Sequence, residues 1–271
     1  MLKKPLVSIL IASYNKEKYV ERCIKSCKSQ TYNNIEIIFY DDGSKDNSYE
    51  IAKKIKGIKS FKNKNRKNLK KFNTYYQINS YNKAFLKSKG KYILLLDSDD
   101  FFKKNKVKEI VDYFNKNKNC KIVFDLPIYY HSKNKQIYLK NIIKNKNKED
   151  VWPSYPIAGS CISFHRSFYK NYSYIINIKN FSMLTLDFRL AVISNSIMND
   201  FRLLDKNLTY YFQDKKGESY SKFMKFRKNW WLRRKQAHDF MKKINKKKKI
   251  SLTTKSDYLI TNLFKKIYNF I

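Results

Sequence analysis

Glycine is scarce in this chain, which has five glycines among 271 residues. They cannot be arranged into the G-x-G-x-x-G of dinucleotide-binding folds or the G-x-x-x-x-G-K of phosphate-binding loops, because they stand at positions 43, 57, 90, 159 and 217. Cysteine is equally scarce, and the four cysteines show neither a disulfide framework nor the paired spacing of a zinc site. We interpret the cysteines as reduced core or helix residues.

Long apolar runs are also missing. No stretch of about 18 uninterrupted apolar residues occurs, and the first twenty residues become polar too soon for a secretory signal. We therefore expect a cytoplasmic protein. The apolar fraction of 42% is enough to bury a core, so we expect one large domain or one domain with an appendage.

Acidic residues are few, with 22 Asp and Glu against 59 Lys and Arg, a net charge of +37. Such a charge favours nucleic acid or an anionic membrane as partner, although frequent Lys, Asn, Ile, Tyr and Phe are also typical of an AT-rich coding sequence. The position of the charge is more informative. From Lys222 onward, sixteen Lys or Arg oppose only Asp239 and Asp257, and aromatic residues, Trp230 and Trp231 among them, lie between the bases.

Residues 221–271, here called the basic tail, are predicted to be helical. Interfacial aromatics combined with basic charge favour contact with anionic lipid headgroups, so we expect a peripheral protein on the inner face of the cytoplasmic membrane. The alternative is a helix packed on the rest of the protein with a solvated basic face. Both can hold together.

Apolar runs of strand length alternate with segments of helical spacing. The first half predicts strands at 6–11, 35–40 and 92–96 and helices at 16–30, 48–58, 78–89 and 107–117. Gly90 is expected to close the third helix at its C′ position. The second half predicts strands at 121–130 and 203–212, a return to the sheet within 152–164 and a helix at 187–194. This βαβα order predicts an α/β sheet covered on both faces.

Carboxylates cluster where two predicted strands end. Five of the 22 acids lie in two short loops about 55 residues apart, at positions 41, 42, 97, 99 and 100. Ligands of open α/β sheets bind beyond the carboxyl ends of the strands. Like charges oppose one another's ionisation unless a cation neutralises them, and oxygen ligands suit Mg²⁺ or Mn²⁺. The pattern therefore predicts a divalent metal that offsets charge on a departing nucleotide diphosphate.

Simpler interpretations of these loops exist. Asp-Asp-Gly-Ser is a good turn sequence and Asp-Ser-Asp-Asp can cap a helix, but their joint occurrence at two strand ends favours a site. An EF-hand calcium loop fits poorly, because Phe101 and Phe102 stand where it needs a third ligand and a glycine.

The order and spacing of four segments resemble glycosyltransferase family 2, the inverting enzymes with a GT-A fold. The segments are Val7-Ser-Ile-Leu-Ile-Ala-Ser-Tyr-Asn15, Gln30-Thr-Tyr-Asn-Asn-Ile-Glu-Ile-Ile38, Asp41-Asp-Gly-Ser44 and Gly90-Lys-Tyr-Ile-Leu-Leu-Leu-Asp-Ser-Asp-Asp100. The resemblance covers roughly residues 5 to 115. It implies a Rossmann-like mixed sheet with helices on both faces. Residues 1–220 would form the GT-A domain, 1–115 its nucleotide-binding half and 116–220 its acceptor half, and the basic tail would be a helical extension.

The resemblance also implies roles for single residues. Ala12 and Tyr14 would line the nucleotide pocket, Asp42 would hold the base and Asp41 would support it. Within the Asp-Xaa-Asp motif, Asp97 and Ser98 would face ribose or phosphate and Asp99 would ligate Mn²⁺ or Mg²⁺.

Two departures from the family pattern affect the expected site. Ser80-Tyr81-Asn82 stands where many members have Ala-Arg-Asn, so we expect another base to substitute, for instance one within 62–71. Where the family places a Glu-Asp pair at a helix start, the chain has Leu186-Asp187. Inversion needs a base that deprotonates the acceptor hydroxyl, and Asp187 is our candidate. Its alternative is a helix-start carboxylate, and Asp150 and Asp200 are weaker candidates for the base.

Two later segments add hypotheses from the resemblance alone. Asp214 falls where the family often has a histidine and could join the metal shell, or it is an exposed loop acid. Gly159 and Ser160 could border the acceptor pocket.

The sequence thus predicts a metal-dependent, inverting glycosyltransferase. It would move a sugar from a nucleotide diphosphate sugar, with UDP favoured, to a cell-surface glycan such as lipooligosaccharide or capsular polysaccharide, or to a lipid-linked glycan. A sugar nucleotidyltransferase would need a glycine-rich basic loop, which residues 12–15 are not. A nucleic-acid-binding protein would not need acids at strand ends, so no nucleic-acid partner is expected.

Overall fold

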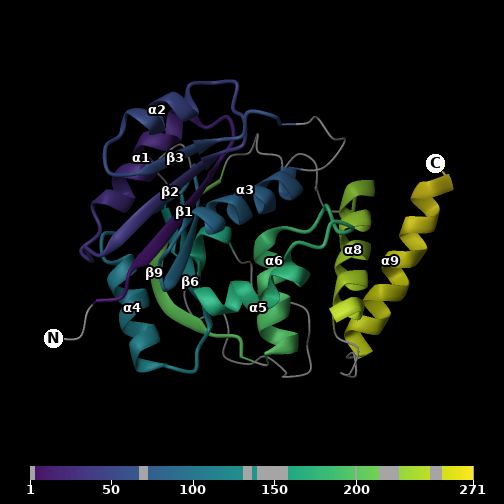
Figure 1. The fold of residues 1–271 in the computed structure, drawn as a ribbon. Coiled ribbons are helices and arrows are strands. Elements are labelled where there is room, and N and C mark those ends of the chain that lie inside the picture. Colours follow the sequence, from purple (N-terminus) through teal and green to yellow (C-terminus); the bar gives the residue numbers. More distant parts are fainter. Residues whose placement is uncertain are drawn as a thin grey trace.

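The computed structural model describes residues 4–66, 73–130, 136–138, 158–198, 200–213, 226–244 and 252–270. It contains a nine-stranded mixed sheet with helices on both faces (Figure 1). The strands of the first half are β1 (Val7–Ser13), β2 (Ile35–Asp41), β3 (Lys59–Lys62) and β4 (Tyr92–Asp97). All four run parallel, in the order β3-β2-β1-β4.

The later strands extend the same sheet beyond β4. They are β5 (Phe101–Phe102), β6 (Ile122–Tyr130), β7 (Gln136–Tyr138), β8 (Ile162–His165) and β9 (Leu203–Phe212). Their order is β4-β8-β6-β9-β5, and β7 pairs with β6. β8 pairs antiparallel with both β4 and β6, and β6 runs parallel to β9. The sheet is therefore mixed, as the family resemblance implies.

Helices cover both faces because the buried strands carry apolar side chains on both. In β1, Val7, Ile9 and Ile11 belong to one core cluster, whereas Leu10 and Ala12 belong to the other, as the period of two in a strand requires. The first cluster includes side chains of α1 (Glu17–Lys28), α2 (Ser48–Lys54) and α4 (Lys106–Lys116). The second includes those of α3 (Asn73–Lys87), α5 (Arg166–Ile176) and α6 (Leu186–Val192).

The last two helices are α8 (Lys228–Ile244) and α9 (Leu252–Phe270), and α9 lies outermost in Figure 1. α8 contributes Ala237, Phe240 and Met241 to the core cluster that also contains α3, α5 and α6. Trp231 is buried and stacks on Phe264 of α9 with ring centroids 4.3 Å apart. Trp231 therefore joins the two helices and is not one of the exposed aromatics of the tail, whereas membrane contact of the tail as a whole stays a prediction. The expected boundary at residue 220 lies outside the described residues.

Three local features differ from the predictions. The sequence analysis did not predict α5 or the two-residue strand β5. Gly90 is not a left-handed C′ residue, since the glycines with positive φ are Gly43 and Gly57. Gly90 instead permits close packing, because a Cβ there would lie 2.4 Å from Ser8 Oγ and 2.5 Å from Ser8 N.

No described helix combines the length and apolarity needed to cross a bilayer.

Candidate active site

The predicted site residues come together at the carboxyl ends of β1, β2 and β4. The parallel register pairs Ser13 with Asp41 and Ala12 with Asp97, so the loops that follow these strands start side by side. Ser98 N donates to Ala12 O at 3.1 Å and Asp42 N donates to Ser13 O at 2.9 Å. The sheet itself therefore gathers both acidic loops at one edge.

Asp41 holds the loop after β2 in shape. Its carboxylate accepts hydrogen bonds from Gly43 N at 3.0 Å and Ser44 N at 2.8 Å, and from the Ser44 hydroxyl. Gly43 has φ of +79°, and a Cβ there would lie 2.9 Å from Asn63 O, so glycine is required at this turn. Asp41 thus stabilises the loop that carries Asp42, and its part in nucleotide binding stays a prediction.

Asp42 contacts Arg66, which belongs to the 62–71 segment where the sequence predicts a substitute for the missing arginine. Arg66 Nε lies 3.3 Å from Asp42 Oδ2, and Asn63 donates to Asp42 Oδ1 at 3.0 Å. The Arg66 guanidinium carbon lies 3.3 Å from the ring centroid of Tyr14 and 4.5 Å from that of Tyr76. Burial raises the pKa of Asp42. Among the described residues of the 62–71 range, Arg66 is a base that reaches the residues expected to bind the nucleotide.

Asp97 is held from α3. Gln77 Nε2 donates to Asp97 Oδ1 at 2.6 Å, and the Tyr81 hydroxyl donates to the same oxygen at 2.8 Å. Tyr81 stands at the position where many family members have an arginine, and its hydroxyl supplies a hydrogen-bond donor there. Ser160 Oγ accepts from Asp97 N at 2.9 Å, and Ser98 is buried behind the loop.

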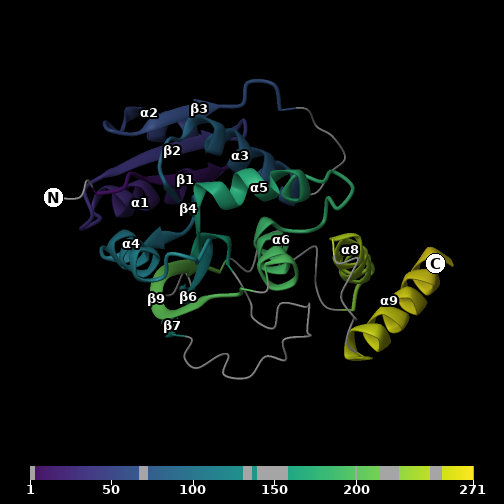
Figure 2. The ribbon, with the colours of Figure 1, turned by 60° about the horizontal axis from the view of Figure 1, so that its bottom comes forward.

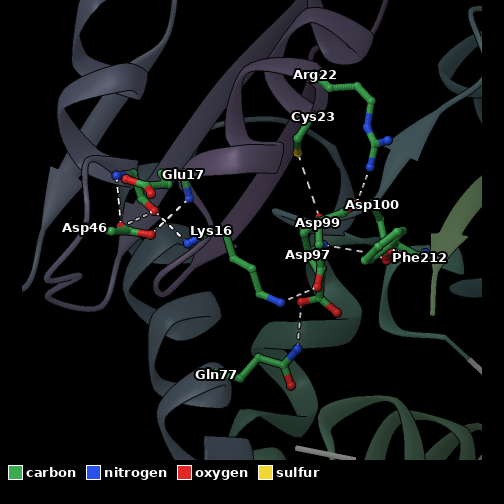
Figure 3. A network of polar contacts seen from close by, with 12 residues as sticks. Lys16, Glu17, Arg22, Cys23, Asp46, Gln77, Asp97, Asp99, Asp100 and Phe212 are labelled. Carbon is green, nitrogen blue, oxygen red and sulfur yellow. Dashed lines mark hydrogen bonds and ion pairs between the residues drawn. The ribbon is translucent and has the colours of Figure 1, made fainter. Parts of the chain in front are cut away.

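Asp99 is partly exposed and contacts a lysine of the loop after β1. Its Oδ2 lies 2.6 Å from Lys16 Nζ, and the exposed fraction of its side chain is 21% (Figure 3). Burial lowers the pKa of Lys16, but the neighbouring acids, Asp99 foremost, together outweigh burial, so the pKa of Lys16 is raised overall. Arg22 fixes the backbone here by donating to Asp99 O at 3.0 Å.

Asp100 belongs to the acid cluster predicted at the strand ends, but its carboxylate is buried and holds neighbouring segments together. It accepts from Ser160 Oγ at 2.5 Å and from Phe212 N at 2.8 Å, so it joins the loop after β4 to η1 (Gly159–Cys161) and to the end of β9. Burial raises its pKa well above the ordinary value. Burial, followed by the charge of Asp99, raises the pKa of Asp97 to about 6.

These contacts leave Asp99 as the carboxylate best suited to a metal. Asp97 Oδ1 and both carboxylate oxygens of Asp100 already accept hydrogen bonds from the protein, whereas the Asp99 carboxylate contacts a single lysine. No group of three or more His, Cys, Asp and Glu side chains in the described ranges is arranged to hold an ion. One carboxylate fits Mg²⁺ or Mn²⁺ that takes its other ligands from water and diphosphate.

Asp187 joins this acid cluster from α6. Its charge contributes to the raised pKa values of Asp97 and of Tyr211 on β9, so all three groups lie near one another. Burial raises the pKa of Asp187 itself. Its Oδ1 also accepts from Phe188 N at 2.7 Å, which is the contact of a helix-start carboxylate. Asp187 can therefore be both a helix-start carboxylate and the base that deprotonates the acceptor hydroxyl.

Asp200, the other candidate base that the structure describes, is not brought to the site. Asp200 pairs with Arg202, and its charge acts on Tyr113 and Cys120. Asp150 and Asp214 lie outside the described residues. Gly159 does border Asp97, because a Cβ added to it would lie 3.4 Å from Asp97 Oδ2.

Residues 8–174 match the glycosyl transferase family 2. This chain belongs to that family. An uncharacterized glycosyltransferase of Haemophilus influenzae is 39% identical over 117 residues, which cover 42% of this chain and 34% of the relative. WfaP of Escherichia coli, a UDP-Glc:alpha-D-GlcNAc-diphosphoundecaprenol beta-1,3-glucosyltransferase, is 36% identical over 130 residues, 47% of each chain. These matches therefore span less than half of the length of either relative.

The fold matches that of solved TarS structures. S. aureus TarS 1–349 in complex with UDP superposes with a TM-score of 0.62 over 96% of this chain and 69% of that chain, at 14% identity. This likeness establishes the GT-A fold and nothing finer. The predicted residues lie at or beside the carboxyl edge of the sheet: Ala12, Tyr14, Asp41, Asp42, Asp97, Ser98, Asp99 and Asp187.

Sequence reasoning missed three residues that lie at the candidate site. Lys16 immediately follows the loop after β1, a position that could have suggested it. Gln77 is one of many polar residues of α3 and carries no signal. Arg233 comes from α8 in the basic tail, where its Nη2 donates to Thr185 Oγ1 at 3.3 Å and its charge acts on Asp187. Nothing in the sequence separates Arg233 from its neighbouring bases.

Proposed function

We propose that this protein is an inverting glycosyltransferase that moves a sugar from a nucleotide diphosphate sugar to a glycan acceptor. The observation that carries the proposal is the gathering of Asp97, Asp99 and Asp187 at one edge of a GT-A sheet. A base and a metal-ligating carboxylate are the two groups that inverting transfer needs on opposite sides of the sugar carbon.

The nucleotide would bind against β1 and β2. Asp42 offers a carboxylate for a base N–H, and Tyr14 offers a ring edge or face beside Arg66. Arg66 Nη1 is buried and has no hydrogen-bond partner among the described residues, so a carbonyl or hydroxyl of the ligand would satisfy it. Uridine is favoured, because WfaP is a UDP-Glc-dependent glucosyltransferase and TarS is solved in complex with UDP.

A divalent Mn²⁺ or Mg²⁺ would bind at Asp99. The ion would supply charge neutralisation for the departing diphosphate. Lys16 would have to release Asp99 for this, and it would then be a cation beside the phosphates. Asp97, fixed by Gln77 and Tyr81, would face the ribose or sugar, and Ser98 would support it from the loop.

Asp187 would take the proton of the acceptor hydroxyl. Burial raises its pKa, which makes the carboxylate a stronger base than an exposed aspartate. We propose a cell-surface glycan or a lipid-linked glycan as acceptor, since WfaP acts on a diphosphoundecaprenol-linked sugar. Such an acceptor would place the protein at an anionic membrane surface.

Calorimetric binding of UDP, GDP, CDP and TDP, first with Mn²⁺ and then with EDTA, tests the donor site. We expect one nucleotide, UDP, to bind with metal, and EDTA or Asp99→Ala to weaken it at least about tenfold, as loss of a charge-assisted contact does. Asp112→Ala, which removes an exposed carboxylate paired with Lys108, is the matched control and should bind normally. Absence of nucleotide binding with metal would refute the proposal.

Asp187→Asn tests the base separately. The amide cannot accept the proton, so transfer should fall by about 10² to 10⁴. Nucleotide binding should remain within about twofold, because Asp187 is not proposed to touch the nucleotide. Asp200→Asn is the control and should leave transfer unchanged, since Asp200 pairs with Arg202. Full transfer by Asp187→Asn would remove the residue from this role.

A further inference from the structure

The outer surface of α9 is apolar. Nine large apolar side chains are exposed among the described residues, and five of them lie on α9: Leu259, Ile260, Leu263, Phe264 and Ile267. Most of the others are scattered singly over the molecule, such as Leu86 on α3. Scattered apolar residues are normal on a protein surface, whereas a concentration on one helix indicates an interaction site.

These five side chains share one side of the helix. Leu259, Leu263 and Ile267 are spaced at i, i+4 and i+8, with Ile260 and Phe264 one position further round. A different side faces α8, where Thr261 is buried, Asp257 pairs with Arg234 and the Tyr268 hydroxyl donates to Phe226 O at 2.8 Å. Phe264 lies between the two sides, because its ring stacks on Trp231. We call Leu259, Ile260, Leu263 and Ile267 the apolar face of α9.

The apolar face is not needed to form the protein core. Neither core cluster includes a described residue of α9, and α8 lies between α9 and the sheet (Figures 1 and 2). α9 is therefore attached to the molecule by one side and presents another to the exterior.

The surroundings of this face are positively charged. Lys266 on α9 is exposed, as are Lys242 and Lys243 at one end of α8 and Arg227 and Lys228 at the other. The two acids of the described tail are both neutralised, Asp239 by Lys235 and Asp257 by Arg234. Contact between two copies of this face would bring like charges together, whereas anionic lipid complements them.

We infer that α9 is a membrane-surface helix that binds anionic lipid. Leu259, Leu263 and Ile267 enter the boundary between headgroups and acyl chains, and Lys266 with the lysines of α8 contacts the headgroups. The lipid contact is argued from α9 alone and rests on the proposed function only in one respect: a membrane-linked acceptor would explain why the enzyme binds a membrane. The contact also defines which side of the protein faces the lipid. α9 lies on the surface, since the described helices are too short or too polar to span a bilayer.

Sedimentation with phosphatidylcholine vesicles, with and without phosphatidylglycerol, tests this inference on the full chain. We expect binding to the phosphatidylglycerol vesicles and weak binding to phosphatidylcholine alone. The double variant Leu259→Ser with Leu263→Ser should lose about tenfold or more in vesicle affinity. Leu86→Ser is the matched control, because Leu86 and Leu259 are both 68% exposed, and it should bind vesicles like the wild type.

Several results would overturn the inference. They are no binding of the wild type to phosphatidylglycerol vesicles, equal binding by the double variant, and equal binding to both kinds of vesicle. A wild-type dimer that the double variant converts to a monomer would assign the apolar face to a second copy of the chain. Binding of UDP with Mn²⁺, measured without vesicles, keeps the two proposals separate: it should be the same in wild type and double variant, and its failure alone contradicts only the transferase site.

Discussion

A buried lysine stands beneath the acid cluster. Lys106 Nζ lies 2.6 Å from Asp125 Oδ1 and donates to Ser160 O at 2.8 Å and to Thr209 Oγ1 at 2.5 Å, and its side chain is fully buried. Ser160 in turn contacts Asp97 and Asp100. Lys106 thus connects the expected donor site to the strands β6 and β9 that carry the second half of the sheet.

Lys106→Met should therefore destabilise the fold. Removal of one partner leaves Asp125 as an unpaired buried charge, so we expect the free energy of unfolding to fall by about 3–5 kcal/mol. Lys108→Met, which breaks the exposed pair with Asp112, should cost less than about 1 kcal/mol. Urea denaturation of the two variants measures the difference. Similar small losses in both would show that the buried pair contributes little.

At the scale of single elements, α8 organises the segment that carries the candidate base. Gln236 Oε1 accepts from Met183 N at 3.0 Å, and Arg233 donates to Thr185 Oγ1 at 3.3 Å. Phe240 contacts Phe181 edge to face with ring centroids 5.4 Å apart. Three side chains of one helix thus hold residues 181–185, which lead directly into Asp187 and α6.

Arg233→Gln should shift the pH dependence of transfer. Asp187 works as a base only when deprotonated, so transfer rises with pH through its pKa. Burial raises that pKa and the nearby Arg233 lowers it. Asp97 on β4 and Tyr211 on β9 are further titratable groups near Asp187 in the described part of the chain. Removal of the arginine charge should raise the pKa further and move the acid limb of kcat to higher pH.

The neighbouring arginine provides the control for this experiment. Arg234 pairs with Asp257 and points to α9, so Arg234→Gln should leave the acid limb in place. A pH profile of Arg233→Gln that coincides with the wild type, even at reduced kcat, would assign Arg233 a purely structural role.

At the scale of the whole molecule, α8 is packed into the core that the GT-A helices share. Phe240 is completely buried in a cluster with residues of α3, α5 and α6. The buried Phe240 side chain packs α8 against the domain, and α9 contacts the rest of the protein through α8. We propose that the described part of the basic tail up to residue 244 is part of the catalytic unit.

Phe240→Ala measures this integration. A fully buried phenylalanine should cost about 3–5 kcal/mol on truncation. Phe264→Ala, whose ring is 37% exposed on α9, should cost clearly less. Chemical denaturation followed by fluorescence gives both values. A loss below about 1 kcal/mol for Phe240→Ala, without a second unfolding transition, would indicate that α8 is a loosely attached appendage.

The sequence by itself determined the first half of the fold and most of the site. Apolar runs fixed β1, β2 and β4, and the acids that follow them had to meet, because the carboxyl ends of parallel neighbours share one edge of the sheet. The same reasoning could not find α5, whose aromatic and Ser/Asn-rich segment has weak helix propensity, since packing of Phe168 and Tyr169 in the core stabilises it.

Only the tertiary structure decided which basic residues serve the site. The chain has 59 Lys and Arg, and a sequence pattern does not distinguish one from the next. Arg66 is selected because its loop lies against Tyr14 and Asp42, and Arg233 because α8 packs beside α6. Contacts between residues far apart in the chain depend on how helices pack on the sheet, and local periodicity carries no information on that packing.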